Sequence, residues 1–159
     1  MKELAWTWQW EGIGTALLVS VDTAALLGSY RQGYWRCERG GQLFGDISDA
    51  SGIWLVVSRP HPADTAGRTW LELDHHRCLA EIEEANRRGF RLIGYWHTHP
   101  QRVPRASGRD RASFARFSEI HKESLPNPIA VIVGRSLSYR GIRAWSVREN
   151  GLVEAKLIQ

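Results

Sequence analysis

Two histidines, a serine and an aspartate lie close together near the middle of the chain. They are His97, His99, Ser107 and Asp110, spaced as H-x-H-x7-S-x-x-D. Two histidines and one carboxylate are a recurring ligand set for catalytic zinc, which keeps a fourth position for water. A His-x-His pair alone is a weak signal, but the whole spacing indicates a metal site with catalytic chemistry.

The elements around these residues could bring the four side chains together. An apolar run from Leu92 to Trp96 predicts a buried strand, and residues two apart on a strand share a face. Ser107 and Asp110 are three apart, so they share a face if they open a helix. Ser107 could cap that helix and Asp110 could complete a capping box. We predict a strand, a loop and a helix that runs from Ser107 to about Ser124.

A second candidate lies well upstream, at Glu38. The residues from Glu38 to Gly45 read E-x-G-G-x-L-x-G. The Gly40-Gly41 pair next to Glu38 permits a close backbone approach or a positive φ, which suits a turn. A surface charge next to a turn is the alternative reading of this glutamate.

Together the two motifs resemble the JAMM motif of the MPN+/JAB metallopeptidase family. The match covers all four positions of the downstream motif and the E-x-G-G-x-L-x-G signature around Glu38. By order of elements, the likeness extends from about Asp22 to about Val133. The resemblance implies an α/β protein with the cytidine-deaminase-like MPN/JAB fold, in which two or three helices flank a central mixed β-sheet.

The resemblance also implies a role for each site residue. One Zn²⁺ per chain would be held by His97, His99 and Asp110. Glu38 would act as general base and then general acid, and Ser107 would donate a hydrogen bond to the oxyanion. The family acts on peptide and isopeptide bonds, so the chain is expected to be a zinc metallopeptidase.

The expected substrate is a ubiquitin-like protein, removed from its conjugates or processed at its C-terminal glycine. The resemblance is to the compact prokaryotic deubiquitinase-like type, some members of which belong to antiphage conjugation systems. E1- and E2-like enzymes of the same operon would then be partners. Three alternatives stay open: processing of a sulfur-carrier protein with a C-terminal Gly-Gly, a DNA-associated JAB protein, and a non-catalytic MPN scaffold.

Basic residues cluster between and after the expected ligands. Arg102, Arg105 and Arg109 are expected to border the substrate channel, and the formal net charge of the chain is +4. Such a cluster is also typical of nucleic-acid binding. An acidic protein partner explains it equally well, and we expect no nucleic acid.

Length and composition limit the remaining possibilities. A chain of 159 residues with 43% hydrophobic residues predicts one globular domain, residues 1–159. No apolar run is long enough for a membrane span, and the start of the chain lacks the pattern of a signal peptide. Cys37 and Cys78 fit no Cys-x-x-Cys pattern. We therefore expect a cytoplasmic protein with free thiols.

The other elements follow from periodicity and turn signals. Alternating Leu4, Trp6, Trp8 and Trp10 predict a strand whose aromatic face packs in the core. A helix capped by Asp22 should come after a strand over residues 13–20. Further strands are predicted over residues 43–47, 53–57, 129–133, 142–148 and 152–158.

The last two of these strands flank the Asn150-Gly151 hairpin signal. Residues 59–69 should form a loop. Asp74 should cap a helix over residues 75–88, with an apolar stripe of Leu79, Ile82 and Ala85. On the helix after Ser107, the residues expected to face the core are Phe114, Phe117 and Ile120.

Overall fold

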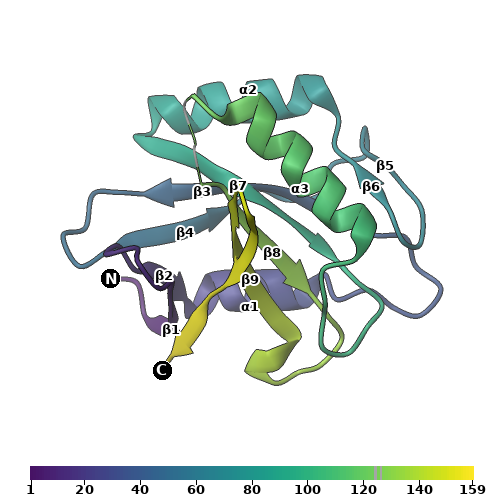
Figure 1. The fold of residues 1–159 in the computed structure, drawn as a ribbon, viewed down its shortest axis with the longest axis horizontal. Coiled ribbons are helices and arrows are strands. Elements are labelled where there is room, and N and C mark those ends of the chain that lie inside the picture. Colours follow the sequence, from purple (N-terminus) through teal and green to yellow (C-terminus); the bar gives the residue numbers. More distant parts are fainter. Residues whose placement is uncertain (124, 126) are drawn as a thin grey trace.

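The computed structural model describes residues 1–123, 125 and 127–159. Among them, nine strands form one mixed sheet in the order β10-β9-β8-β7-β3-β4-β2-β1-β11, and two short strands form a separate hairpin. Figure 1 shows α2 and α3 on the upper side of the strands and α1 below them. The elements are β1 (Leu4–Gln9), β2 (Leu17–Ser20), α1 (Val21–Ser29), β3 (Gly40–Asp46), β4 (Ile53–Val57), β5 (Thr65–Ala66), β6 (Leu71–Glu72), α2 (His75–Arg87), β7 (Phe90–Thr98), α3 (Gly108–His121), β8 (Ile129–Val133), β9 (Ile142–Arg148), β10 (Gly151–Glu154) and β11 (Lys156–Ile158), with a 3-10 turn over Tyr139–Gly141.

The α/β class with a central mixed sheet and flanking helices, expected from the sequence, is confirmed. Only the pairs β2–β4 and β7–β8 are parallel, and the other neighbours in the sheet are antiparallel. Strands β10 and β11 lie at opposite edges of the sheet although only Ala155 separates them. The sheet therefore curls back on itself, and Figure 1 shows both chain ends at the same side of the molecule.

The first strand follows its predicted pattern, but the elements after it differ from expectation. Trp6, Trp8 and Trp10 are buried, as the alternation predicted. Strand β2 begins only at Leu17, which makes it shorter than expected. The cap of α1 is Ser20, whose hydroxyl accepts a hydrogen bond from the Thr23 amide at 3.1 Å, so the assignment of Asp22 as the cap was wrong.

Alternation along the central strands separates two cores. On β8, Val131 and Val133 pack with Leu27 of α1, whereas Ala130 and Ile132 pack with Phe114 of α3. Each run of four or more apolar residues predicted only that the strand is buried. The structure shows that both faces of β8 are covered, one by each core.

Close approach of the strands requires small residues at the centre of the sheet. A Cβ atom on Gly94 of β7 would lie 1.7 Å from the carbonyl oxygen of Ile129 on β8. One on Gly40 of β3 would lie 2.1 Å from the carbonyl oxygen of Trp96 on β7. These contacts are far inside van der Waals distance, so only glycine permits the observed strand spacing at these two positions.

Helix α2 begins after its predicted cap, since the Asp74 carboxylate accepts a hydrogen bond from the Arg77 amide at 2.9 Å. Gly89, at φ +83°, follows its end as expected. The apolar stripes were partly wrong, because Leu79 is 53% exposed and Ile120 on α3 is 70% exposed. The predicted end of α3 near Ser124 lies outside the described residues.

One loop and one strand were also predicted incompletely. The segment over residues 59–69 is mostly irregular, but Thr65–Ala66 pairs with Leu71–Glu72 as the β5–β6 hairpin. The last predicted strand is divided in two, β10 and β11, at Ala155. Within the described residues, no helix combines the length and apolar character that a membrane crossing needs.

Candidate metal centre

Strand β7 presents the two histidines from one face. Tyr95 and His97 pack against Phe114 of α3, with ring centroids 5.1 and 5.8 Å from it. The intervening Trp96 belongs to the opposite core. His99 follows the end of β7 and keeps the alternation, because its amide donates to the Val133 carbonyl of the parallel strand β8 at 2.8 Å.

The start of α3 supplies the carboxylate. Ser107 is the N-cap of this helix, and its hydroxyl accepts a hydrogen bond from the Asp110 amide at 3.1 Å. In return, the Asp110 carboxylate accepts one from the Ser107 amide at 2.6 Å. The predicted capping box is therefore present, and it orients the carboxylate toward the histidines.

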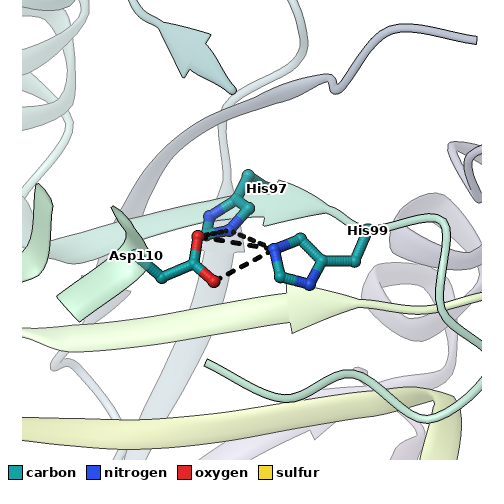
Figure 2. A group of neighbouring side chains, drawn as sticks. All are labelled: His97, His99 and Asp110. Atoms are coloured by element: carbon teal, nitrogen blue, oxygen red, sulfur yellow. Dashed lines mark hydrogen bonds and ion pairs between the residues drawn. The ribbon is translucent and has the colours of Figure 1, made fainter. Parts of the chain in front are cut away.

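The three side chains point toward one another, as Figure 2 shows. The His97 Nε2 atom lies 3.2 Å from His99 Nε2 and 3.0 Å from Asp110 Oδ1, and His99 Nε2 lies 3.1 Å from Asp110 Oδ2. Tetrahedral ligands at zinc bond lengths near 2.0–2.1 Å are roughly 3.3 Å apart. The spacing and chemistry of these buried donors therefore fit a small divalent cation such as zinc.

Burial and charge shift the pKa values of the three donors in different directions. Burial lowers the pKa of His97, which keeps its ring in the neutral form that binds metals. Burial also acts to lower the pKa of His99, but the hydrogen bond and charge of Asp110 outweigh it and raise that pKa. Burial tends to raise the pKa of Asp110, yet its hydrogen bonds with both histidines hold that pKa well below the usual range.

Glu38 lies beside this group as a fourth side chain and a second carboxylate, outside the cluster of His97, His99 and Asp110. Its Oε1 atom is 3.9 Å from His99 Nε2, and the residue is 4% exposed. Burial raises the pKa of Glu38 to about 8. The charge of His99 acts to lower this pKa, the negative charge of Asp110 adds to the rise, and the positive charge of Arg109 acts to lower it. A cation held by the three ligands would lower this pKa again. A buried carboxylate next to a metal site can accept and donate protons.

Pairing of β3 with β7 brings Glu38 to this place. Gly40 pairs with His97, and the antiparallel register continues one step beyond the strand to Arg39 and Thr98. The Thr98 amide donates to the Arg39 carbonyl at 2.8 Å. Glu38 directly precedes Arg39, and its side chain thereby reaches to 3.9 Å from His99, the residue after Thr98. The close approach that this requires explains the glycine at position 40 of the signature.

A comparison with known families places most of the chain in one family. Residues 25–148 match the family model described as prokaryotic homologs of the JAB domain. The chain belongs to this JAB-domain family. The family membership and the MPN/JAB fold that the sequence motifs implied are thereby confirmed.

Curated relatives support the JAB assignment over part of their length. A Pseudomonas aeruginosa protein named CD-NTase/cGAS isopeptidase is 32% identical over 106 residues, 65% of this chain and 66% of the relative. Proteins of the same name from Enterobacter hormaechei and Escherichia coli are 30% identical over 99 residues and 28% identical over 123 residues. These alignments cover 61% and 75% of this chain, and 55% and 76% of the relatives.

A solved structure shares the fold. The solution structure of protein DSY2949 from Desulfitobacterium hafniense has a TM-score of 0.59 with this chain, and the alignment covers 86% of this chain and 87% of that one. The two chains are 18% identical. At this identity, the likeness shows a shared fold and carries no statement about function.

The structure brings together most of the residues that the JAB motif singles out. His97, His99, Asp110 and Glu38 converge, and Ser107 adjoins Asp110 through the capping box. Three arginines lie between His99 and Asp110 in the sequence, in the connecting loop and at the start of α3. All three are exposed to solvent: Arg102, Arg105 and Arg109. Both cysteines are free thiols.

Two positioning residues, Thr98 and Gln32, were missed by the motif. Thr98 lies between the two histidines but faces the other side of β7, where its hydroxyl accepts the Arg39 amide at 3.0 Å and donates to Gln32 Oε1 at 3.1 Å. The Gln32 amide then donates to the carbonyls of Arg36 and Arg68 at 2.7 and 2.8 Å. These hydrogen bonds join both segments around Glu38 to the strand that carries the two histidines.

A buried ion pair, Arg77 with Asp64, supports the same region from α2. The Arg77 guanidinium binds the Asp64 carboxylate in a two-point contact at 2.7 and 3.0 Å, and it donates to the Gly40 carbonyl at 3.1 Å. It also pairs with Glu81 at 2.9 Å. The arginine resembles an ordinary surface charge in the sequence, so only the fold reveals that it links the segment before α2 to β3.

Asp64 should make stability depend on pH. Burial acts to raise its pKa, but hydrogen bonds from Arg77 and from the Asp74 amide outweigh burial, so its folded pKa lies below the usual value. Its contribution is therefore present above the unfolded pKa of about 3.9 and is lost as the pH falls further. Asp64→Asn should lower the unfolding free energy by about 3 kcal/mol near pH 7, because Arg77 loses its charged partner.

Chemical denaturation of wild type and Asp64→Asn at pH 7 and near pH 3 measures this contribution. The difference between the two proteins should shrink at the lower pH. The exposed Asp22, in the first turn of α1, provides the control substitution Asp22→Asn. A difference of equal size at both pH values would contradict the assignment to the Asp64 charge.

Proposed function

We propose that this chain is a zinc-dependent isopeptidase of the JAB-domain family, with residues 1–159 acting as one catalytic domain. It would cleave the amide bond between the C-terminal carboxyl of a conjugated protein and the Nε atom of a lysine. The observation that carries the proposal is the group of three buried donors at tetrahedral spacing, with Glu38 beside it and outside the ligand set. The printed names of the curated relatives support the bond type.

The ligands would be His97, His99 and Asp110. A zinc ion held there would supply Lewis-acid chemistry, polarising a carbonyl group and lowering the pKa of a water molecule. The ligands are fixed in advance, since a strand, its continuation and a capped helix start each hold one of them. Preorganised sites of this kind need no rearrangement during the reaction.

Glu38 is proposed to move the proton. It takes a proton from the attacking water as the water oxygen bonds to the carbonyl carbon, and it delivers that proton to the lysine nitrogen as the C–N bond breaks. The products are a free carboxyl group and a free amine. Burial beside His99, without participation in the capping box or in the ligand set, suits Glu38 to this role.

Ser107 is proposed to donate its hydroxyl proton to the developing oxyanion. Its oxygen already accepts a hydrogen bond from the Asp110 amide, and this bond leaves the O–H group able to donate elsewhere. The helix cap therefore holds the serine next to the metal ligand without using its donor. This role follows from the family motif.

Two proteins are candidates for the conjugated partner. The relatives are named for CD-NTase/cGAS, so a CD-NTase joined to a lysine is the candidate that the relatives favour. A ubiquitin-like protein, as expected from the sequence motif, is the second candidate. A place in an antiphage conjugation system with E1- and E2-like enzymes stays part of the proposal, whereas the present observations do not favour a sulfur carrier, DNA or a scaffold role.

The metal assignment predicts one zinc ion per chain. Protein purified without added metal should contain it by elemental analysis, and the His97→Ala/His99→Ala variant should not, because one carboxylate alone binds zinc weakly. The exposed pair at the start of α2 supplies a matched control, His75→Ala/His76→Ala, which should keep its zinc. Unchanged zinc content in the His97→Ala/His99→Ala variant would contradict the assignment of these histidines as metal ligands.

The acid–base assignment predicts a catalytic defect without loss of metal. Glu38→Gln should retain zinc and lower turnover of an isopeptide-linked conjugate by roughly 10²–10⁴, the contribution expected of a positioned general acid–base group. Gel-based cleavage and zinc content should be measured on the same sample. Near-wild-type turnover would refute the role, and loss of zinc would show that Glu38 is a ligand or a folding residue.

The arginines between the ligands are proposed to attract the substrate. Replacing Arg102, Arg105 and Arg109 with alanine should raise KM at low salt, and the difference from wild type should fade at high salt because exposed charges are screened. Initial rates at several salt concentrations measure this. A loss of kcat that does not depend on salt would instead indicate a structural role for these residues.

A further inference from the structure

Two loops next to Glu38 display an unusual group of exposed aromatic side chains. Trp35 is 84% exposed and Tyr34 is 54% exposed, and Trp70 on the neighbouring loop is 40% exposed. Single exposed apolar residues are common, but a contiguous group of large ones marks a binding surface. We refer to Tyr34, Trp35 and Arg68, which contact one another, as the aromatic patch.

Contacts within the aromatic patch restrict the motion of its side chains. The rings of Tyr34 and Trp35 meet edge to face, with centroids 4.7 Å apart and an interplanar angle of 88°. The Arg68 guanidinium lies 4.5 Å from the centroid of Tyr34 and 5.6 Å from that of Trp35, and its Nε donates to the Tyr34 carbonyl at 2.9 Å. Preordered side chains lose little entropy when they bind a partner.

The aromatic patch is attached directly to the catalytic segment. The Glu38 amide donates to the Gly67 carbonyl at 2.8 Å, and Gly67 precedes Arg68. Buried Gln32 joins the same two loops through the carbonyls of Arg36 and Arg68. A protein bound to the patch is therefore held within a few residues of the group that handles the proton.

The charges of these loops indicate the chemistry of the partner. Residues 30–37 contain Arg31 and Arg36 and no carboxylate, and the β5–β6 hairpin contains Arg68 and one carboxylate, Glu72, at its far end. Their complement is a protein segment that offers apolar side chains together with aspartate or glutamate. Tryptophan, tyrosine and arginine are also the residues that most often dominate the energy of protein interfaces.

We propose that the aromatic patch binds the conjugated protein, the partner whose C-terminal carboxyl forms the isopeptide bond. This inference rests on the proposed isopeptidase function. In an enzyme that removes one conjugated protein from several lysine-bearing proteins, the conjugated protein is the part that all its conjugates share. A recognition surface built beside the reacting groups therefore fits the constant partner, through an acidic segment with exposed apolar side chains.

Two substrates separate binding at the patch from catalysis. One is an intact CD-NTase or ubiquitin-like protein joined to a lysine peptide, and the other is a short isopeptide that contains only its last few residues. Trp35→Ala and Arg68→Ala should lower kcat/KM for the intact conjugate at least about tenfold more than for the short isopeptide, mainly through KM. Zinc content and melting temperature report that the variants are folded.

The matched control is Ile47→Ala. Ile47 is 54% exposed and follows the end of β3, whereas Glu38 precedes the start of the same strand. This substitution should leave the rates with both substrates unchanged. Equal losses with both substrates in the patch variants, or no loss with either, would overturn the proposal.

Failure of the proposed function would be recognised separately, because wild-type protein would then cleave neither substrate. In that case, titration of free CD-NTase and free ubiquitin-like protein into wild type and Trp35→Ala decides the matter. Binding to wild type that weakens at least about tenfold in Trp35→Ala supports the patch. Equal binding, no binding, or binding of the lysine peptide alone overturns it.

Discussion

The site depends on the antiparallel pairing of β3 with β7 at Gly40 and His97 and on its continuation through Arg39 and Thr98. This pairing brings together two segments that are far apart in the chain: one carries Glu38, and the other carries both histidines. Glycine at position 40 permits it, because any Cβ there would meet the Trp96 carbonyl oxygen. Without this register, the donors and Glu38 would not face one another.

The elements around this pairing each hold one part of the site in place. The capping box at the start of α3 directs Asp110 toward the histidines, and Phe114 of the same helix packs on the His97 ring. On the opposite face of β7, Thr98 and Gln32 bind the backbone around Glu38. Because buried polar groups left without a partner are costly, this hydrogen-bond network favours one arrangement of the four functional side chains.

Much of this arrangement could be predicted from local sequence signals. The His-x-His pair, the Ser107–Asp110 capping box and the glycines after Glu38 each report on a short stretch of chain, and the structure brings all of them together. Strands such as residues 53–57 and 129–133 were predicted at their observed bounds, since long apolar runs and turn residues define them. The family motif supplied the order in which these pieces are assembled.

Other features depend on contacts that no local signal contains. Leu79 and Ile120 fit an apolar helical stripe, yet each lies on the exposed side of its helix because the sheet covers only a narrow face. Ser20 is the cap in place of Asp22 because α1 begins directly after β2, at Val21, two residues earlier than the predicted cap implied. In the sequence, Thr98, Gln32 and Arg77 resemble ordinary polar residues. Only the contacts between distant segments in the fold show that they bind the backbone on either side of Glu38.

The most direct test of the central claim is a double-mutant cycle between Thr98 and Glu38, with kcat on an isopeptide-linked conjugate as the measured quantity. If Thr98 acts by positioning Glu38, Thr98→Val should lower kcat roughly 10- to 100-fold with zinc retained, and Thr98→Ser should restore it, since serine keeps the hydroxyl. In a Glu38→Gln background, Thr98→Val should then cause no further loss. An equal loss in both backgrounds, or wild-type kcat for Thr98→Val, would contradict the claim that this strand pairing places the catalytic base.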